Sequence, residues 1–263
     1  MNKRERFSKI IEDIKKVKIQ GASNITKSAL LAYSLIKTKQ AKEKLINARP
    51  TEPMLINTLN YFEKIGYKKT LQHFNQAQNK INKLVFKLIK NNSIIFTHCH
   101  STNVINALIY AKKKGRKFSV LNTETRPLFQ GRKTSKELEK AGIKVTEFID
   151  AGAGIAIKQA DLIFLGADAI LNSGVINKIG SGMFAEIAYD EKKPVYIIAD
   201  SWKFSPKNVK IEERNFKEIW KNAPKNIKIE NPAFELIPKK YIKAIISELG
   251  ILTLEKFVRK IRR

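Results

Sequence analysis

Cysteine and histidine are scarce in this sequence of 263 residues, which has one cysteine, Cys99, and three histidines. A lone cysteine excludes an intramolecular disulfide, and with it the disulfide framework of small secreted proteins. No apolar run approaches the roughly 18 residues that a membrane-spanning helix needs. The basic amino terminus also lacks the apolar core of a secretory signal. We therefore expect a soluble, cytoplasmic protein with no membrane association.

Acidic residues are the second shortage. The chain has 24 Asp and Glu against 51 Lys and Arg, a formal net charge of +27. Such a balance favours anionic partners, which include phosphorylated metabolites, RNA and acidic protein surfaces. The basic residues are spread along the whole chain, so a general compositional bias explains the charge equally well. The hydrophobic share of 43% is sufficient for a packed core and argues against disorder.

The first third of the chain, residues 1–90, contains helical patterns only. Pro53 suits the first turn of a helix and Gly66 its end. Residues 71–88 then repeat apolar side chains every three or four positions, which indicates another helix. His73 lies beside that apolar stripe, and a polar boundary position is favoured over a catalytic one. The sequence thus predicts a helical amino-terminal domain over 1–90.

From residue 91 onward short apolar runs alternate with amphipathic segments. The predicted strands cover residues 93–96, 118–122, 144–149, 161–166 and 194–200. Five alternations of strand and helix predict a doubly wound parallel sheet, so residues 91–263 should form a Rossmann-like α/β domain. Thr134 and Glu137 have the spacing of a capping box. Near the carboxyl terminus, the apolar stretch 242–249 is expected to be helical.

Polar residues recur where the predicted strands end. Cys99 follows the first strand, Asp150 the third, Asp168 the fourth and Lys203 the last. In an open α/β sheet, ligands bind beyond the carboxyl ends of the strands. These residues therefore predict a ligand site, although the pattern alone does not specify its chemistry.

Cys99 lies in "THCHS", between a strand and the start of a helix. Backbone N–H groups and the helix dipole at such a place would lower the pKa of a thiol and favour the thiolate. A buried, inert cysteine is the common alternative. A metal site is less favoured, because His98 and His100 would point away from Cys99 in an extended segment. Zinc needs three or four converging ligands, and no second His/Cys cluster exists.

Two further stretches carry candidate polar groups. Asp168 emerges from a buried strand in "LGADAI", where desolvation would raise the pKa of its carboxyl and allow it to carry protons. It could equally cap the next turn. Asn177 and Lys178 in "VINKIGSG" stand just before a helix, an arrangement that suits a phosphate. An ordinary glycine-rich turn with a solvated lysine is the alternative.

Several long motifs, in order, resemble a known superfamily over residues 14–204. It unites the ribose-1,5-bisphosphate isomerases, the methylthioribose-1-phosphate isomerases and the α, β and δ regulatory subunits of translation initiation factor 2B. The motifs are "THC-x-S", "TETRPLFQGRKTSKEL", "GADAILNSGVINKIGSGMFA" and "PVYIIADSWKF". The resemblance implies the same fold that the strand and helix patterns predict.

The resemblance also implies roles for individual residues. Cys99 matches the catalytic cysteine of the isomerases and Asp168 their catalytic aspartate, acting without a metal or another cofactor. The residues that match substrate-binding positions are Gln20, Gly21, Ala22, Ser23, Arg49, Ser101, Thr102, Asn177, Lys178 and Lys203.

Two departures from the family pattern are Gln20, where arginine is usual, and His100, where asparagine is usual. Regulatory subunits commonly lack the cysteine and replace the aspartate, so Cys99 and Asp168 together favour an enzyme. We expect an aldose–ketose isomerase that converts ribose 1,5-bisphosphate to ribulose 1,5-bisphosphate in nucleotide salvage. The alternative is a non-catalytic subunit that binds initiation factor 2. By analogy with relatives, we expect a homo-oligomer, either a dimer or a hexamer.

Overall fold

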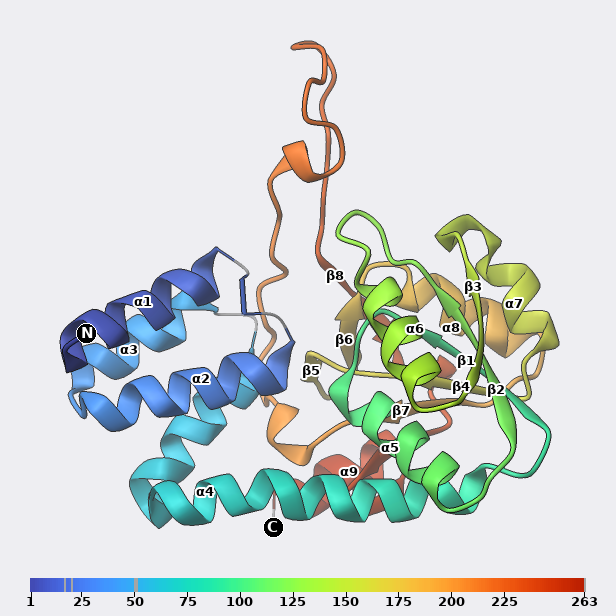
Figure 1. Ribbon diagram of the computed structural model, residues 1–263, viewed down its shortest axis with the longest axis horizontal. Coiled ribbons are helices and arrows are strands. Elements are labelled where there is room, and N and C mark those ends of the chain that lie inside the picture. The colour runs from blue at the N-terminus through green and yellow to red at the C-terminus, as the bar shows by residue number, and fades with distance from the viewer. Residues whose placement is uncertain (17, 20, 50–51, 263) are drawn as a thin grey trace.

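The computed structural model describes residues 1–16, 18–19, 21–49 and 52–262, which form a helical part and an α/β part (Figure 1). The helical part comprises α1 (Lys3–Lys15), α2 (Ala22–Leu35), α3 (Lys39–Ala48) and α4 (Pro53–Leu88). Gly66 interrupts α4, as its sequence position suggested. Its backbone is non-helical, with a positive φ of 78° at which glycine avoids the steric penalty of other residues, so α4 consists of two helical segments that meet at a kink.

The helical part has its own apolar core. Ile14, Leu30, Leu45 and Leu59 are each 0% exposed and come from α1, α2, α3 and α4 in turn. Trp202, which belongs to the α/β part, also packs into this cluster. The second half of α4 leaves the cluster and packs against the sheet with its apolar stripe, so α4 connects both parts.

The α/β part is built on a seven-stranded sheet in the order β10-β9-β7-β4-β1-β2-β3. Neighbouring strands are parallel except for the β9–β10 hairpin. The strands are β1 (Ser93–His98), β2 (Phe118–Thr123), β3 (Lys144–Phe148), β4 (Leu162–Leu165), β7 (Val195–Ile198), β9 (Ala244–Ser247) and β10 (Gly250–Leu252). Their apolar side chains alternate between the two faces, as for Ile95 and Phe96, which join different core clusters.

Helices cover both faces of this sheet. The second half of α4 shares a core cluster with α5 (Thr102–Lys113) and α6 (Gln130–Lys140). On the other face, α7 (Ala153–Gln159), α8 (Ser181–Asp190) and α9 (Leu254–Ile261) contribute to a second cluster. The predicted fold class is confirmed: helices come first, followed by a Rossmann-like, doubly wound parallel sheet. The predicted division at residue 90 stays a prediction.

A small antiparallel sheet and a long excursion complete the fold. β5 (Ala169–Ile170), β6 (Gly174–Lys178) and β8 (Phe234–Pro238) form the small sheet. Between the 3₁₀ turn η2 (Ser201–Lys203) and β8, residues 205–233 form an arm that extends from the body (Figure 1, orange).

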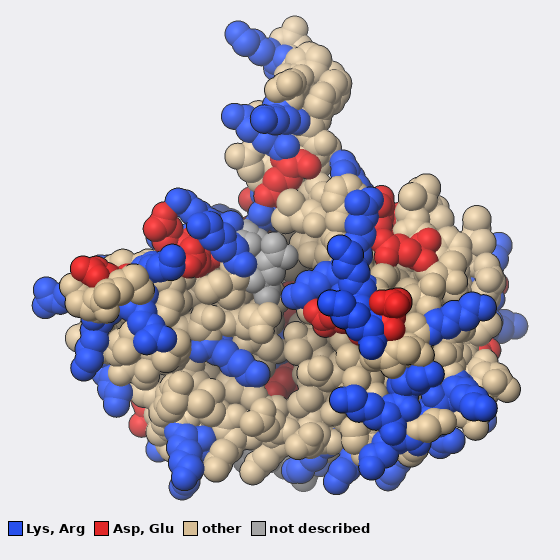
Figure 2. Space-filling model, viewed as in Figure 1, with Lys and Arg blue, Asp and Glu red and all other residues tan. Residues whose placement is uncertain are grey.

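Lys and Arg side chains are scattered over the face in view, including the arm (Figure 2). None of the described helices has the length and apolarity required to cross a membrane.

Two local predictions from the sequence are wrong. The stretch 242–249 contains strand β9 rather than a helix, because four consecutive buried residues, Ala244–Ser247, pair with β7 at the centre of a core. Thr134 does not cap a helix, since α6 begins earlier, at Gln130. Its hydroxyl instead donates to the carbonyl oxygen of Cys99 at 2.7 Å, which ties α6 to the end of β1.

Candidate functional site

One pocket, between the start of α2 and the carboxyl ends of the strands, gathers the residues that the sequence proposed. It is lined by Gly21, Ala22, Ser23, Arg49, Cys99, Ser101, Thr102, Asp168, Asn177, Lys178 and Lys203, among others. Gln20 lies outside the described residues. Positions up to 182 residues apart in the chain are thus brought to one place, although their roles stay predictions.

Cys99 is held at the pocket wall by its backbone. It follows β1 directly and has a φ of 64°, unusual for a residue other than glycine. Its N–H donates to the Thr125 hydroxyl at 3.0 Å, and its carbonyl oxygen accepts from Thr134. These contacts from the loop after β2 and from α6 support the left-handed conformation. Such a strained, well-supported conformation is typical of functional positions.

The Cys99 thiol is protonated at neutral pH. Burial raises its pKa to about 11, and the charge of Lys178 only partly opposes this. The sequence-based expectation of a lowered thiol pKa is therefore wrong for this structure. The free-energy cost of desolvating a thiolate exceeds the stabilisation that the helix start and the charge of Lys178 provide. A thiol in this state can donate a proton and is a weak nucleophile.

Asp168 stands two residues beyond the end of β4, on the same pocket. Its N–H donates to the Ile176 carbonyl oxygen at 2.8 Å, which fixes the backbone. Burial raises the pKa of its carboxyl, against the charges of Lys203, Lys178 and Arg49. This direction is the one expected from the sequence. An ionised Asp168 is consequently a stronger base than an exposed carboxylate.

Basic side chains surround the two candidate proton carriers. Lys203 Nζ donates to the Ala167 carbonyl oxygen at 2.5 Å, beside Asp168. Lys178, at the end of β6, is only 6% exposed. Arg49 Nη1 approaches Glu212 Oε2 at 2.8 Å. A pocket with several buried cations suits a ligand that carries more than one negative charge.

The remaining predicted contacts are small polar groups. Asn177 Nδ2 donates to the Ser181 hydroxyl at 2.9 Å, at the first residue of α8. The Ser101 hydroxyl is buried and has no hydrogen-bond partner among the described residues. A Cβ at Gly166 would lie 2.6 Å from that hydroxyl oxygen, so glycine is required for this close approach. The glycine in "LGADAI" is thereby explained by packing beneath the site.

The histidines of "THCHS" support the site rather than bind a metal there. His98 Nδ1 accepts from the Thr123 hydroxyl at 2.5 Å, and its Nε2 donates to the Ile179 carbonyl oxygen at 3.0 Å. Burial lowers the pKa of His98 to about 4, so the ring is neutral. His100 Nε2 lies 3.1 Å from Glu137 Oε1. Within the described part of the chain, neither ring nor Cys99 belongs to a group of three converging metal ligands.

Sequence reasoning missed four charged residues that line the pocket: Glu52, Lys133, Glu212 and Arg214. Glu52 directly follows the segment in which Arg49 was proposed, but a lone glutamate has no recognisable signature. Its side chain is almost fully buried, and burial together with Asp168 raises its carboxyl pKa to about 8. Glu212 reaches the pocket because the first limb of the arm passes its rim, a course that no local pattern predicts.

Asp150, the polar residue after β3, does not line the pocket. Its two carboxylate oxygens accept from the N–H groups of Thr125 and Arg126, at 2.9 and 2.6 Å. It thereby shapes the loop whose Thr125 hydroxyl holds Cys99.

The sequence profile of the initiation factor 2 subunit family matches residues 12–254. The chain belongs to this family. Curated relatives include ribose 1,5-bisphosphate isomerases from Archaeoglobus fulgidus and Thermococcus kodakarensis. The first is 32% identical and the second 34%, and both alignments cover 92% of this chain and 88–89% of the relative. The isomerases among these relatives place the chain with the enzymes of the family, as the sequence predicted.

Other relatives are named as translation initiation factor proteins rather than isomerases. A putative translation initiation factor eIF-2B subunit 2-like protein of Pyrococcus furiosus is 28% identical, over 94% of this chain and 96% of its own length. The solved structure of a translation initiation factor eIF-2B from Pyrococcus horikoshii matches with a TM-score of 0.86 at 27% identity. It covers 95% of this chain and 97% of that one. A 5-methylthioribose 1-phosphate isomerase from the same organism, at 23% identity and a TM-score of 0.80, shows the shared fold.

Proposed function

We propose that the protein is an aldose–ketose isomerase that converts ribose 1,5-bisphosphate to ribulose 1,5-bisphosphate. The observation that carries the proposal is that Cys99 and Asp168 line one pocket together with several buried cations. Isomerases of this substrate among the relatives support it. The notable net charge of +27 suits an anionic substrate as well.

The reaction needs one proton donor and one proton acceptor. When the ring opens, the bond between C1 and the ring oxygen breaks, and that oxygen takes a proton. The hydrogen on C2 moves to C1, and the C2 hydroxyl loses its proton as it becomes the ketone. Cys99, held as a thiol, supplies the first proton, and the Asp168 carboxylate accepts the second.

The basic residues would bind the two phosphate groups. Lys178 and Lys203 reach the pocket from the strand ends, whereas Arg49 reaches it from the helical part. Because a phosphate brings several acceptor oxygens, charge-assisted hydrogen bonds from these residues would orient the sugar between Cys99 and Asp168. The loop at Gly21, Ala22 and Ser23 would contribute further contacts to a phosphate.

The test is an isomerisation assay of the purified chain, with ¹³C NMR detection of the ketone carbon. Ribose 1,5-bisphosphate is expected to be converted, while ribose 5-phosphate and methylthioribose 1-phosphate should react at least ~100-fold more slowly. Loss of a phosphate or an altered sugar removes binding energy that positions the reacting atoms. No conversion of ribose 1,5-bisphosphate, or faster conversion of a comparison substrate, would refute the proposed substrate.

A second function is favoured by one observation, the likeness to the eIF-2B structure of Pyrococcus horikoshii. The alternative is a non-catalytic subunit that binds initiation factor 2. Copurification with initiation factor 2 from the native organism, together with no turnover of any of the three sugar phosphates, would support this alternative. Turnover without copurification would exclude it. A homo-oligomer, dimer or hexamer, is proposed under either function.

A further inference from the structure

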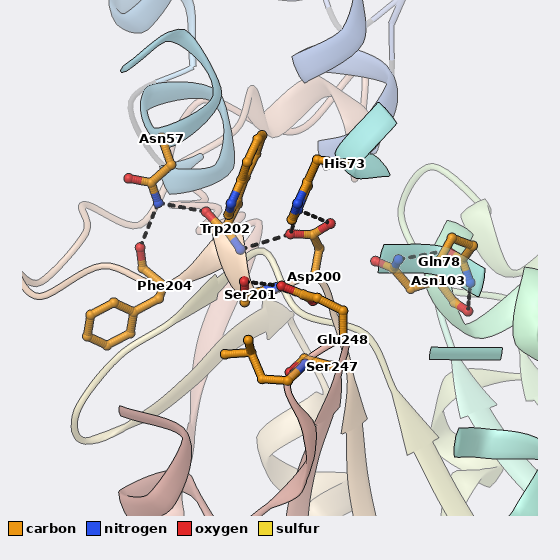
Figure 3. A network of polar contacts seen from close by, with 11 residues as sticks. Asn57, His73, Gln78, Asn103, Asp200, Ser201, Trp202, Phe204, Ser247 and Glu248 are labelled. Carbon is orange, nitrogen blue, oxygen red and sulfur yellow. Dashed lines mark hydrogen bonds and ion pairs between the residues drawn. The ribbon is translucent and has the colours of Figure 1, made fainter. Parts of the chain in front are cut away.

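A second cluster of titratable side chains lies outside the pocket, at the carboxyl end of β7. His73 comes from α4, Asp200 follows β7, and Glu248 lies in the turn between β9 and β10 (Figure 3). One potential ligand atom from each residue lies within 4.8 Å of the other two. Among the described residues, this is the group of three His, Cys, Asp or Glu side chains with such a geometry.

The distances are close to those of a metal site. His73 Nε2 lies 3.0 and 3.1 Å from the two Asp200 oxygens. Zinc binds imidazole nitrogen and carboxylate oxygen at about 2.0–2.2 Å, which places tetrahedral ligand atoms roughly 3.3 Å apart. Shifts of a few tenths of an ångström would therefore admit the ion between His73 and Asp200. The Glu248 oxygen, within 4.8 Å of the other two ligand atoms, would move inward to become the third ligand.

Surrounding groups hold the three side chains in place. The Trp202 ring stacks on the His73 ring at a centroid distance of 3.6 Å and an angle of 2°. The backbone N–H of Trp202 donates to Asp200 Oδ1 at 2.9 Å. The Ser201 N–H and hydroxyl both donate to Glu248 (Figure 3). Such outer contacts, which orient ligands without touching the metal, are a regular part of metal sites.

The local charge also favours a cation. Asp200 is only 2% exposed, and the Glu248 carboxylate lies close to it. Among the described residues, no lysine or arginine forms an ion pair with either carboxylate, and His73 pairs with Asp200. A divalent ion between the two carboxylates would remove their mutual repulsion.

We propose that His73, Asp200 and Glu248 form a binding site for a divalent transition-metal ion such as Zn²⁺. One imidazole and two carboxylates suit Zn²⁺ or Co²⁺, with water as the remaining ligand. The ion would join α4 to the ends of β7 and β9. Because Lys203 follows Asp200 by three residues, the site would also fix the segment that carries this lysine into the pocket. This proposal does not depend on the proposed isomerase activity.

Trp202 provides a direct probe of the site. The chain has two tryptophans, and the second, Trp220, is 48% exposed on the arm. In a Trp220→Phe background, the fluorescence of Trp202 should be quenched by Co²⁺, which is paramagnetic and would bind beside the stacked ring. We expect saturation at one Co²⁺ per chain, and competition by Zn²⁺. Zn²⁺ should also raise the melting temperature in a concentration-dependent way.

Two substitutions and one control locate the ion. Glu248→Gln keeps the side-chain length and the contacts with Ser201, and should weaken Co²⁺ binding at least ~10-fold. His73→Gln should do the same. The matched control is His100→Gln, which removes the other histidine paired with a glutamate and should leave binding unchanged.

Two outcomes would overturn the proposal. One is no saturable quenching of Trp202 up to millimolar Co²⁺ in the protein with all three ligands. The other is binding that persists in Glu248→Gln and His73→Gln but is lost in His100→Gln, which would place the ion near "THCHS" instead. Both readouts use the full chain and require no substrate, so they stand apart from the isomerase test.

Discussion

Two clusters of titratable side chains lie where the helical part meets the strand ends, and they differ in how their polar atoms are paired. In the pocket, Glu52 Oε2, the Ser101 hydroxyl and Arg49 Nε are buried without hydrogen-bond partners among the described residues. In the cluster of His73, Asp200 and Glu248, each residue has at least one partner. Buried polar atoms without partners cost stability, and a ligand in the pocket would satisfy these three. The paired groups of the second cluster already connect α4 to the strand ends, a connection that the proposed ion would strengthen.

The largest effect is expected for the base of the proposed reaction. Asp168→Asn keeps the size of the side chain but removes the carboxylate that accepts a proton. Turnover of ribose 1,5-bisphosphate should fall ~10²–10⁴-fold. The melting temperature should stay the same or rise, because a buried carboxyl that is costly to ionise is gone. Turnover within threefold of the wild type would remove Asp168 from the mechanism.

Lys203 should contribute mainly to substrate binding. Lys203→Met removes its charge from the pocket while keeping its apolar stem. A hydrogen bond to a charged group contributes about 1.5–3 kcal/mol, so KM should rise ~10–100-fold. Lys207→Met is the matched control, since Lys207 is exposed on the arm. Equal changes in both variants, measured by initial rates, would show that only general charge matters.

The sequence predicted the pocket more completely than its surroundings. The alternation of strands and helices indicated a parallel sheet, and strand ends in such a sheet converge, so Cys99, Asp168 and Lys203 could be placed together in advance. These residues converge because the sheet is parallel, and the repeated alternation of strand and helix patterns in the sequence indicates a parallel sheet.

Long-range contacts were the part that the sequence could not predict. Glu52 reaches the pocket from just before α4, and Glu212 reaches it from the first limb of the arm. Neither position has a local signature in the sequence. The thiol pKa was expected to fall because only the helix start was visible in the sequence. The burial that raises it depends on packing from several distant segments. Strand β9 was missed because a short buried run has the same apolar character in a strand and in a helix.

Buried Glu52 should make the stability of the fold depend on pH. Its carboxyl pKa is raised from 4.5 to about 8, so the folded state holds a proton that the unfolded chain releases between these values. Stability is therefore lost as pH rises through this window. Glu52→Gln lacks this loss, and its melting temperature relative to the wild type should increase by several degrees from pH 5 to pH 8.5. A difference that stays constant with pH would contradict the account.

A smaller effect, on stability rather than on turnover, is expected from the contacts of Asn57 beside the cluster of His73, Asp200 and Glu248. Asn57 Nδ2 donates to the carbonyl oxygens of Trp202 and Phe204 at 2.7 and 2.9 Å (Figure 3). Asn57→Ala removes both bonds and should lower the free energy of unfolding by about 1–2 kcal/mol, as measured by urea denaturation. Turnover should change less than threefold. A large loss of turnover without a loss of stability would assign this region to the chemistry instead.

The central claim is that the half-buried thiol of Cys99 donates a proton to a phosphorylated sugar. The most direct test compares the wild type with Cys99→Ser in the conversion of ribose 1,5-bisphosphate. Serine keeps the size of the side chain but is a far weaker acid, so turnover should fall at least ~100-fold. The melting temperature and the affinity for ribose 1,5-bisphosphate should stay unchanged. Wild-type turnover by Cys99→Ser, in a folded protein that binds the substrate, would contradict the account.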